Sequence, residues 1–202
     1  MFYRPGHDDH GLPHNPYKAI VSPRPIGWIS TLTRNGTANL APYSFFNGVA
    51  DDPPMVMFST TGKKIGRDEV KDSLNNIRET GEFCVSIVSR DLKDAMNLSS
   101  GHYAPDEDEF TVAGLEKGTS QVVKAPFVAA APAALECKLF KEIELPGGAV
   151  MVLGEVVGIH IRDEHIRDGI LDVTSYQPMA RLGYRDYSAV TDIFSLNRPG
   201  QK

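Results

Sequence analysis

The chain has 202 residues, of which 41% are hydrophobic and 23% are charged, and its formal net charge is −5. This composition is typical of a globular protein and excludes an intrinsically disordered chain, and the length fits one domain over residues 1–202. Acidic and basic residues are mixed along the chain without a basic stripe, which argues against a nucleic-acid partner.

The N-terminal segment, residues 1–16, is predicted to be an extended arm. It lacks the apolar core of a secretory signal, and no apolar run in the chain is long enough to cross a bilayer. We therefore expect a cytoplasmic protein with no membrane partner. The arm carries His7, Asp8, Asp9, His10 and His14. No helix or hairpin is predicted there to fix ligand geometry, so we predict no metal site.

The first regular element is a predicted β-hairpin over Pro25 to Leu40. Trp28 and Ile29 begin its apolar strand, and Asn35 and Gly36 would supply the two positive φ angles of a type I′ turn. A continuous apolar run from Met55 to Phe58 follows a proline-rich turn, as expected for a buried strand.

The middle of the chain alternates helix and strand. Leu74 and Ile77 belong to the apolar stripe of a helix over Val70 to Thr80, with Gly81 as its C-terminal glycine. A buried strand is then predicted over Phe83 to Val88. A short helix should run from about Asp91 to Met96 with Ser89 as its cap, and the polar stretch from His102 to Glu109 is interpreted as a solvated loop with an acidic helix start.

A second hairpin is predicted from two long β-rich runs, Ala133 to Ile143 and Val150 to Ile161, with a turn at Pro146-Gly-Gly. His160 alternates with apolar neighbours on this hairpin, and either a structural or a site-facing role is open. Residues 188–202 are predicted to be a tail. Because strands outnumber helices and form hairpins, the pattern favours an antiparallel barrel with peripheral helices over a parallel sheet.

Two cysteines, Cys84 and Cys137, lie inside apolar runs and have no C-x-x-C spacing, which indicates buried, reduced thiols. The chain has no G-x-G-x-x-G fingerprint after a strand, no Walker loop, no G-x-S-x-G elbow and no H-E-x-x-H motif. The common nucleotide-binding and hydrolase chemistries are therefore not indicated.

Five segments in a fixed order carry a resemblance to a known family. They are Arg24–Thr31 (RPIGWIST), Asn39–Asn47 (NLAPYSFFN), Asp52–Ser59 (DPPMVMFS), Lys71–Ile77 (KDSLNNI) and Thr80–Phe83 (TGEF). Together they resemble the flavin reductase-like family, which includes flavoredoxins and the reductase components of two-component monooxygenases. The resemblance covers most of the chain from about Tyr17 to Tyr187. It implies an FMN-binding split β-barrel, mainly β, antiparallel and Greek-key-like, with peripheral α-helices.

The resemblance also implies where FMN binds. A flavin needs a flat apolar slot, donors for its ring edge and a positive site for its phosphate. The residues expected along the ring and ribityl chain are Trp28, Ile29, Ser30, Thr31, Ala41, Pro42, Tyr43, Ser44, Phe45 and Asn47. For Tyr43, Phe45 and Phe46, plain core packing is the alternative.

The phosphate is assigned to Lys71 and Ser73, because the free N–H groups and dipole at a helix start favour an anion. Ser59 and Thr60 are expected as further donors. The alternative is an ordinary N-terminal turn. Family members run almost directly from the strand to the helix, whereas here residues 62–70 intervene, so Lys63, Lys64 or Arg67 could carry the phosphate charge instead.

By resemblance, the expected activity is that of an NAD(P)H-dependent flavin reductase, in which a nicotinamide delivers hydride to flavin N5. Arg24, His160 and Tyr184 are candidates near the open flavin face. A homodimer and a monooxygenase or other redox partner are further expectations. Two alternatives stay open: a flavoredoxin-like electron carrier with tightly bound FMN and no NAD(P)H turnover, and a flavin-binding module without catalysis.

Overall fold

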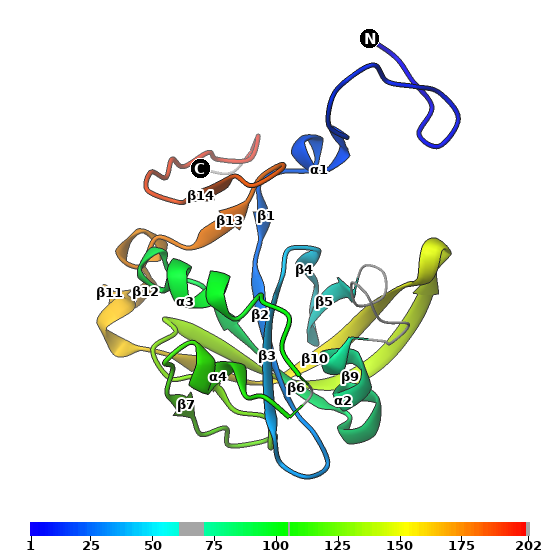
Figure 1. The fold of residues 1–202 in the computed structure, drawn as a ribbon. Helices are drawn as coiled ribbons and strands as arrows, with labels where there is room; N and C mark the ends of the chain where they lie inside the picture. The colour runs from blue at the N-terminus through cyan, green and yellow to red at the C-terminus, as the bar shows by residue number, and fades with distance from the viewer. Residues whose placement is uncertain (61–70, 105, 201–202) are drawn as a thin grey trace.

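The computed structural model describes residues 1–60, 71–104 and 106–200. Its centre is a seven-stranded antiparallel sheet in the order β3-β2-β6-β9-β10-β5-β4 (Figure 1). The strands of this sheet are β2 (Gly27–Leu32), β3 (Ala38–Tyr43), β4 (Phe46–Asp51), β5 (Pro54–Thr60), β6 (Glu82–Ile87), β9 (Ala133–Leu145) and β10 (Ala149–Ile161). The predicted mainly β, antiparallel architecture is confirmed.

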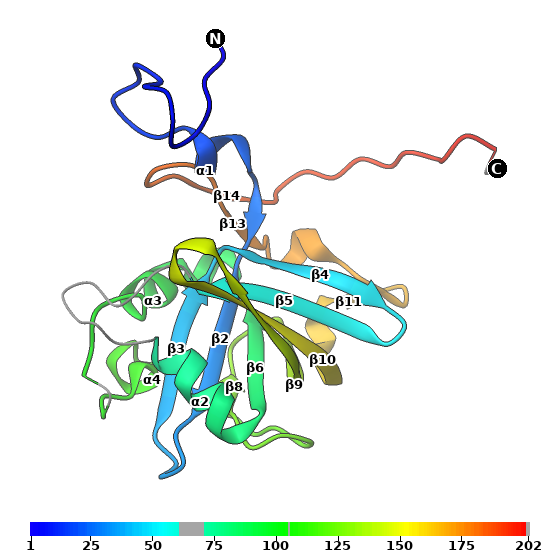
Figure 2. The same ribbon diagram turned by 90° about the vertical axis from the view of Figure 1, so that its right-hand side faces the viewer.

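The two ends of this strand order are brought together by the chain itself. β3 and β4 are the edge strands, yet only Ser44 and Phe45 separate them in sequence. Three residue steps span at most about 11 Å, so the sheet must roll up until its edges are neighbours. Figure 2 shows β4 and β5 running across the direction of β2 and β3. The result is a barrel that is open where β3 turns into β4.

The first hairpin forms as predicted, with Gly27 opposite Tyr43 and Leu32 opposite Ala38, but its turn differs. Only Gly36 in the turn has a positive φ, 87°. The N–H of Thr33 donates to the carbonyl of Thr37 (2.9 Å) and that of Gly36 to the carbonyl of Thr33 (3.0 Å). This is a three-residue loop with one left-handed residue, so the type I′ prediction is wrong.

Helix α2 (Asp72–Thr80) confirms the helix predicted before Gly81, which adopts φ 73° as its C-cap. The predicted start at Val70 lies outside the described residues. Leu74 and Ile77 are buried and pack with Phe58 and Phe83 in one core cluster. The helix therefore covers one face of the barrel strands.

The hairpin of β9 and β10 is confirmed around the turn at Pro146–Gly148, and register shifts at Leu153/Gly154 and Val156/Gly158 bend it. A Cβ on Gly154 would lie 2.3 Å from the ring of Phe83. A glycine is thus required where the long hairpin curves over the core.

Smaller elements surround the barrel. The 3₁₀ turn η1 (Arg90–Leu92) and helix α3 (Lys93–Leu98) stand where the short helix was predicted, but the side chain of Ser89 makes no capping bond. Strand β14 reaches Ala189, so the irregular tail begins later than residue 188. The remaining elements are α1 (Tyr17–Ile20), α3 (Lys93–Leu98), α4 (Glu109–Val112), β1 (Arg24–Pro25), β7 (Lys117–Gly118), β8 (Phe127–Val128), β11 (Ile166–Arg167), β12 (Ile170–Leu171), β13 (Met179–Arg181), β14 (Tyr187–Ala189), η2 (Pro146–Gly148), η3 (Asp163–His165) and η4 (Val173–Ser175).

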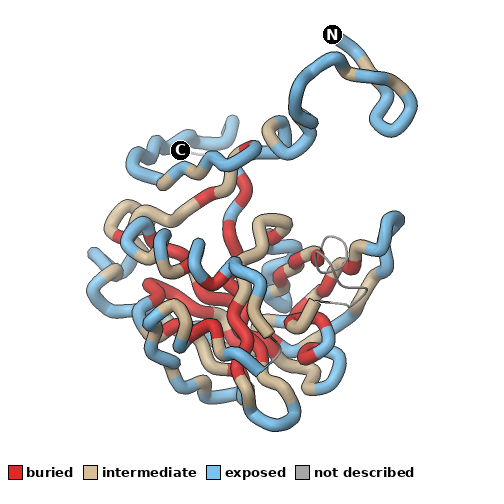
Figure 3. Tube along the Cα trace, in the orientation of Figure 1, coloured by how far each residue is buried: buried red, intermediate tan, exposed pale blue. Residues whose placement is uncertain are grey.

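Strand β2 is buried on both faces, as Figure 3 shows for the centre of the sheet. Ile29 belongs to the core cluster under α2, whereas its neighbour Trp28 belongs to a second cluster with Met96 of α3 and Phe110 of α4. Within the described residues, no helix is long and apolar enough to cross a membrane.

Candidate functional site

A cavity of about 380 Å³ lies between strand β3, the first turn of helix α2 and the segment after helix α3, and we call it the β3–α2 cavity. Its volume falls in the range of small-molecule and cofactor sites. Its lining residues are Asn39, Ala41, Pro42, Tyr43, Lys71, Asp72, Ser73, Ser99, Ser100, Gly101, His102, Tyr103, Ala104 and Glu109. An apolar strand wall therefore faces a polar helix start.

A buried polar network fixes the floor of this cavity. The Ser73 hydroxyl donates to Asn39 Oδ1 (2.7 Å), and Asn39 Nδ2 donates to Glu109 Oε1 (2.8 Å). Glu109 Oε2 accepts the backbone N–H of Leu40 (2.9 Å). Burial raises the pKa of Glu109, and these hydrogen bonds oppose the rise. The network connects helices α2 and α4 to strand β3 and so fixes the positions of the cavity walls relative to one another.

The first turn of α2 forms the other end of the cavity and carries one cation, Lys71, and one carboxylate, Asp72. Lys71 is the N-cap and is half-buried at the cavity wall. The first N–H groups of a helix have no intrahelical acceptor, and the helix dipole makes this end attractive to anions. Lys71 and Ser73, the residues predicted to hold the phosphate, both line the cavity at this helix start, and the Ser73 hydroxyl donates to Asn39.

Tyr43 closes the cavity beside Ser73. Its ring is tilted against Phe58, with ring centroids 4.9 Å apart. Burial raises the pKa of Tyr43 to about 12, although a hydrogen bond with Ser73 acts in the opposite direction. The phenol therefore stays protonated at neutral pH and presents a neutral donor.

A second cavity of about 220 Å³ adjoins the first and shares Pro42 and Ser100 with it. We call it the basic cavity because three cations line it. Its lining residues are Lys18, Arg24, Ile26, Pro42, Ser44, Met96, Ser100, Arg181, Leu182, Tyr184 and Tyr187. Two of the candidates for the open flavin face, Arg24 and Tyr184, are thus brought together here.

Four residues that were predicted to contact the flavin lie in the interior instead. Each is 0% exposed and lines neither cavity: Trp28, Ile29, Ser30 and Thr31. The Trp28 indole donates to Ser99 Oγ (2.9 Å), and Thr31 Oγ1 accepts from Asn76 (2.9 Å). Their expected role is corrected, because β2 is a central strand covered on both faces. These residues support the cavity wall from behind.

Other predicted residues are divided between the cavities and their surroundings. Ser44 lines the basic cavity, and Phe45 lies beneath the guanidinium of Arg24 (5.8 Å). Asn47 is exposed on β4, with its side chain bonded to the N–H of Gly48. Two further expected phosphate donors line neither cavity: Ser59 and Thr60. The three basic residues proposed as substitutes lie outside the described residues: Lys63, Lys64 and Arg67.

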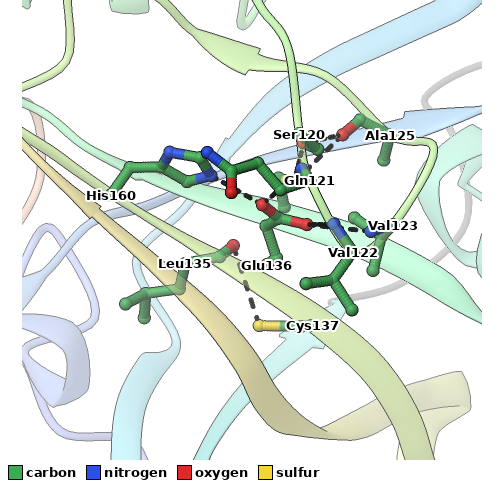
Figure 4. Close-up of polar contacts among 10 residues, drawn as sticks. Ser120, Gln121, Val122, Val123, Ala125, Leu135, Glu136, Cys137 and His160 are labelled. Atoms are coloured by element: carbon green, nitrogen blue, oxygen red, sulfur yellow. Dashed lines mark hydrogen bonds and ion pairs between the residues drawn. The ribbon is translucent and has the colours of Figure 1, made fainter.

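His160 takes the structural role rather than the site-facing one (Figure 4). Its Nε2 lies 2.6 Å from Oε1 of buried Glu136, and its ring stacks on Phe127 at a centroid distance of 4.3 Å. The other Glu136 contacts are the N–H groups of Gln121, Val122 and Val123. His160 lines neither cavity.

The cysteines are buried and free, as expected. Burial raises the pKa of Cys84 to about 12 and also raises that of Cys137. Both thiols are therefore protonated at neutral pH and chemically protected. Within the described residues, no group of three or more His, Cys, Asp or Glu side chains is arranged to hold a metal ion.

Some cavity residues were not anticipated from the sequence. Ser99–Ala104 form the wall opposite β3, and Arg181 and Tyr187 line the basic cavity. Glu109, interpreted as part of a solvated loop, is only 7% exposed. The Asp108-Glu109 pair before Phe110 indicated a helix start, but no local pattern indicates that its carboxylate caps an edge strand 69 residues away.

Comparisons with known proteins agree with this geometry. Residues 21–180 match the family model of the flavin reductase like domain. Nitrilotriacetate monooxygenase component B of Bacillus cereus is 29% identical and covers 97% of this chain and 98% of its own, with a TM-score of 0.88. The 2-nitrobenzoate 2-nitroreductase of Pseudomonas fluorescens is 32% identical, with coverages of 91% and 89% and a TM-score of 0.80.

The fold has a further counterpart. A protein of Shewanella frigidimarina NCIMB 400 with a split barrel domain is 22% identical, with coverages of 90% and 89% and a TM-score of 0.79. At this identity the similarity concerns the fold alone, and it agrees with the rolled, open sheet. The chain therefore belongs to the flavin reductase-like family and has its split-barrel fold.

Proposed function

We propose that the protein is an FMN-binding oxidoreductase that uses NAD(P)H to reduce the flavin, with FMN held in the β3–α2 cavity. The observation that carries the proposal is the shape of that cavity. It joins an apolar strand wall to a helix N-terminus bearing a lysine, which matches a flavin that is flat and apolar at one end and anionic at the other.

The strand wall suits the flavin ring. Ala41, Pro42 and Tyr43 present a mostly apolar surface, and Pro42 belongs to both cavities. Because β3 is an edge strand, a proline without an N–H is tolerated at position 42, while the Leu40 N–H of the same strand is already bonded to Glu109. The ring would lie along this strand and point toward the basic cavity.

The phosphate would bind at the other end, between Lys71 and the first N–H groups of α2. Ser73 donates to Asn39, and Asn39 donates to the Glu109 carboxylate, so this chain of bonds holds the strand and helix in position around the ligand. Neutral Tyr43 adds no charge that would oppose an anion.

Bound FMN supplies the hydride chemistry, so the chain need only bind, orient and shield it. This division of labour fits the described residues, in which the Glu136–His160 pair lies outside both cavities. By similarity to the monooxygenase component B, we further propose that reduced flavin passes to a separate monooxygenase or redox protein. The homodimer and the cytoplasmic location expected from the sequence remain part of the proposal.

The decisive experiment is anaerobic titration of the purified protein with FMN and then with NADH or NADPH. Saturable FMN binding followed by loss of the visible flavin absorbance on adding nicotinamide supports the proposal. A protein that binds no FMN contradicts it. A protein that holds FMN tightly but is not reduced by either nucleotide is a carrier instead, as in the flavoredoxin-like alternative.

The phosphate assignment is tested with Lys71→Ala. Loss of one charged hydrogen bond should weaken FMN binding about tenfold or more, whereas riboflavin, which lacks the phosphate, should bind nearly as before. Lys138→Ala is the control, because Lys138 is exposed on β9 and lines neither cavity. Equal losses for FMN and riboflavin would refute the assignment.

A further inference from the structure

The basic cavity holds more positive charge than the described residues neutralise. Lys18, Arg24 and Arg181 line it, and no aspartate or glutamate does. Within the described part of the chain, none of the three forms an ion pair with a carboxylate. Buried charges in proteins are ordinarily paired, and Arg24 is buried without a carboxylate partner, whereas Arg181 is half-buried and Lys18 is exposed.

Arg24 is the most constrained of these cations. It is only 6% exposed, and its guanidinium donates to the carbonyls of Lys18, Val21 and Leu182 and weakly to Ser44 Oγ (3.5 Å). These neutral acceptors fix its direction without cancelling its charge. Burial lowers the pKa of Arg24, and the charge of Arg181 adds to the effect.

Arg181 is held in the same way. Its guanidinium donates to the carbonyl of Tyr184 (2.6 Å) and to the Tyr187 hydroxyl, and it stacks over the Tyr187 ring at 4.3 Å. Two fixed guanidinium groups that repel each other thus line one small cavity. An anion bound between them would relieve the repulsion and accept charged hydrogen bonds from the remaining N–H groups of Arg181, while Arg24, with four of its five N–H donors in use, contributes mainly its charge.

The rest of the cavity is aromatic and apolar. Ile26, Met96 and Pro42 supply apolar surface, and two tyrosines complete the wall. Tyr184 has φ 55°, a costly conformation for a large side chain, which points to a functional constraint at this turn. A volume of about 220 Å³ fits a single substituted ring better than a dinucleotide.

We propose that the basic cavity binds a small aromatic carboxylate, with its carboxylate between Arg24 and Arg181 and its ring against the apolar wall near Pro42. Because Pro42 and Ser100 border both cavities, the bound ring would lie next to the β3–α2 cavity. That this neighbour is FMN rests on the proposed function, whereas binding of the anion does not. The site would therefore select its ligand by its negative charge and its aromatic ring.

The test is calorimetric titration with benzoate, its neutral analogue benzamide, and inorganic phosphate, with and without FMN. We expect saturable benzoate binding, with benzamide and phosphate each at least about tenfold weaker, because each lacks either the charge or the ring. Arg181→Gln should weaken benzoate at least about tenfold and leave FMN affinity unchanged. Arg185→Gln, an exposed position in the same turn that does not line the cavity, should leave both unchanged.

The proposal would be overturned if the wild-type protein did not bind benzoate at millimolar concentration, or if benzamide or phosphate bound as tightly as benzoate. It would also be overturned if the Arg181→Gln variant bound benzoate as tightly as the wild-type protein. The ligand comparisons use the wild-type protein and so stand even if the variant folds poorly, which circular dichroism would reveal. Benzoate binding without FMN binding would retain this site while refuting the proposed function.

Discussion

Replacing Glu136 by glutamine tests the placement of His160 and the stability of the barrel together. The carboxylate is 1% exposed and accepts four hydrogen bonds, three from backbone N–H groups and one from His160. Burial acts to raise the pKa of Glu136, but the hydrogen bonds outweigh it and lower the pKa from 4.5 to about 2.

The expected loss of folding stability follows from the lowered pKa of Glu136. A tenfold change in proton affinity corresponds to about 1.4 kcal/mol, so the ionised Glu136 stabilises the fold by about 3 kcal/mol. Because the folded pKa lies below the unfolded one, this stabilisation is fully present above about pH 4.5 and is lost as the pH falls toward about 2. The side-chain NH₂ group of a glutamine would also face backbone N–H donors where the carboxylate had an acceptor.

The assay is urea unfolding followed by circular dichroism, from neutral pH down to the acid limit. Glu136→Gln should unfold with about 3 kcal/mol less free energy at pH 7, and the difference from wild type should shrink below about pH 4.5. Glu155→Gln, an exposed carboxylate on β10, should change the free energy by less than about 0.5 kcal/mol. A pH-independent difference, or none, would refute this reasoning.

The same series decides the role of His160. His160→Ala should lower the free energy of unfolding, because it removes one of the four partners of Glu136 and a stacked ring. FMN affinity and turnover of the folded variant should equal those of wild type. A variant with full stability but no flavin reduction would return His160 to the list of catalytic candidates and contradict its placement away from both cavities.

Three further changes probe the fold and the cavity floor. Gly154→Ala should cost about 1–3 kcal/mol of unfolding free energy, because its Cβ would lie 2.3 Å from the ring of Phe83; unchanged urea unfolding would show that the hairpin adapts freely. Ile29→Val should cost about 0.5–1.5 kcal/mol without weakening FMN binding, since Ile29 lies in the core, and a selective loss of FMN affinity would restore it as a flavin contact. Glu109→Ala leaves the Leu40 N–H unpaired, so fluorescence titration should show weaker FMN binding together with a lower melting temperature; wild-type behaviour in both would argue against the network.

Local sequence patterns determined most of the secondary structure. The apolar spacing of Leu74 and Ile77 with a glycine after the last turn predicted helix α2, and Pro146-Gly-Gly between two β-rich runs predicted the β9–β10 hairpin. These signals work because helix periodicity and turn chemistry involve residues close in sequence. The ordered motifs from Arg24 to Phe83 likewise indicated the family correctly.

The turn at Gly36 and the burial of β2 show where local patterns fail. An Asn-Gly pair is compatible with several hairpin turns, and the bonds of Thr33 select the three-residue form. The family resemblance implied that Ser30 and Thr31 contact the flavin, but their hydroxyl groups bond to Pro126 and Asn76 in the interior. Only the partners of a strand decide whether its polar side chains face a ligand or the core.

The site itself depends on contacts between distant segments. The sequence by itself determined the strand wall at Ala41–Tyr43 and the lysine at the start of α2. The tertiary structure decided that Ser99–Ala104 form the opposite wall and that Arg181 joins Arg24 in a second cavity. The physical reason is that rolling the sheet brings together residues separated by 69 to 158 positions, and nothing in their local sequence specifies that meeting.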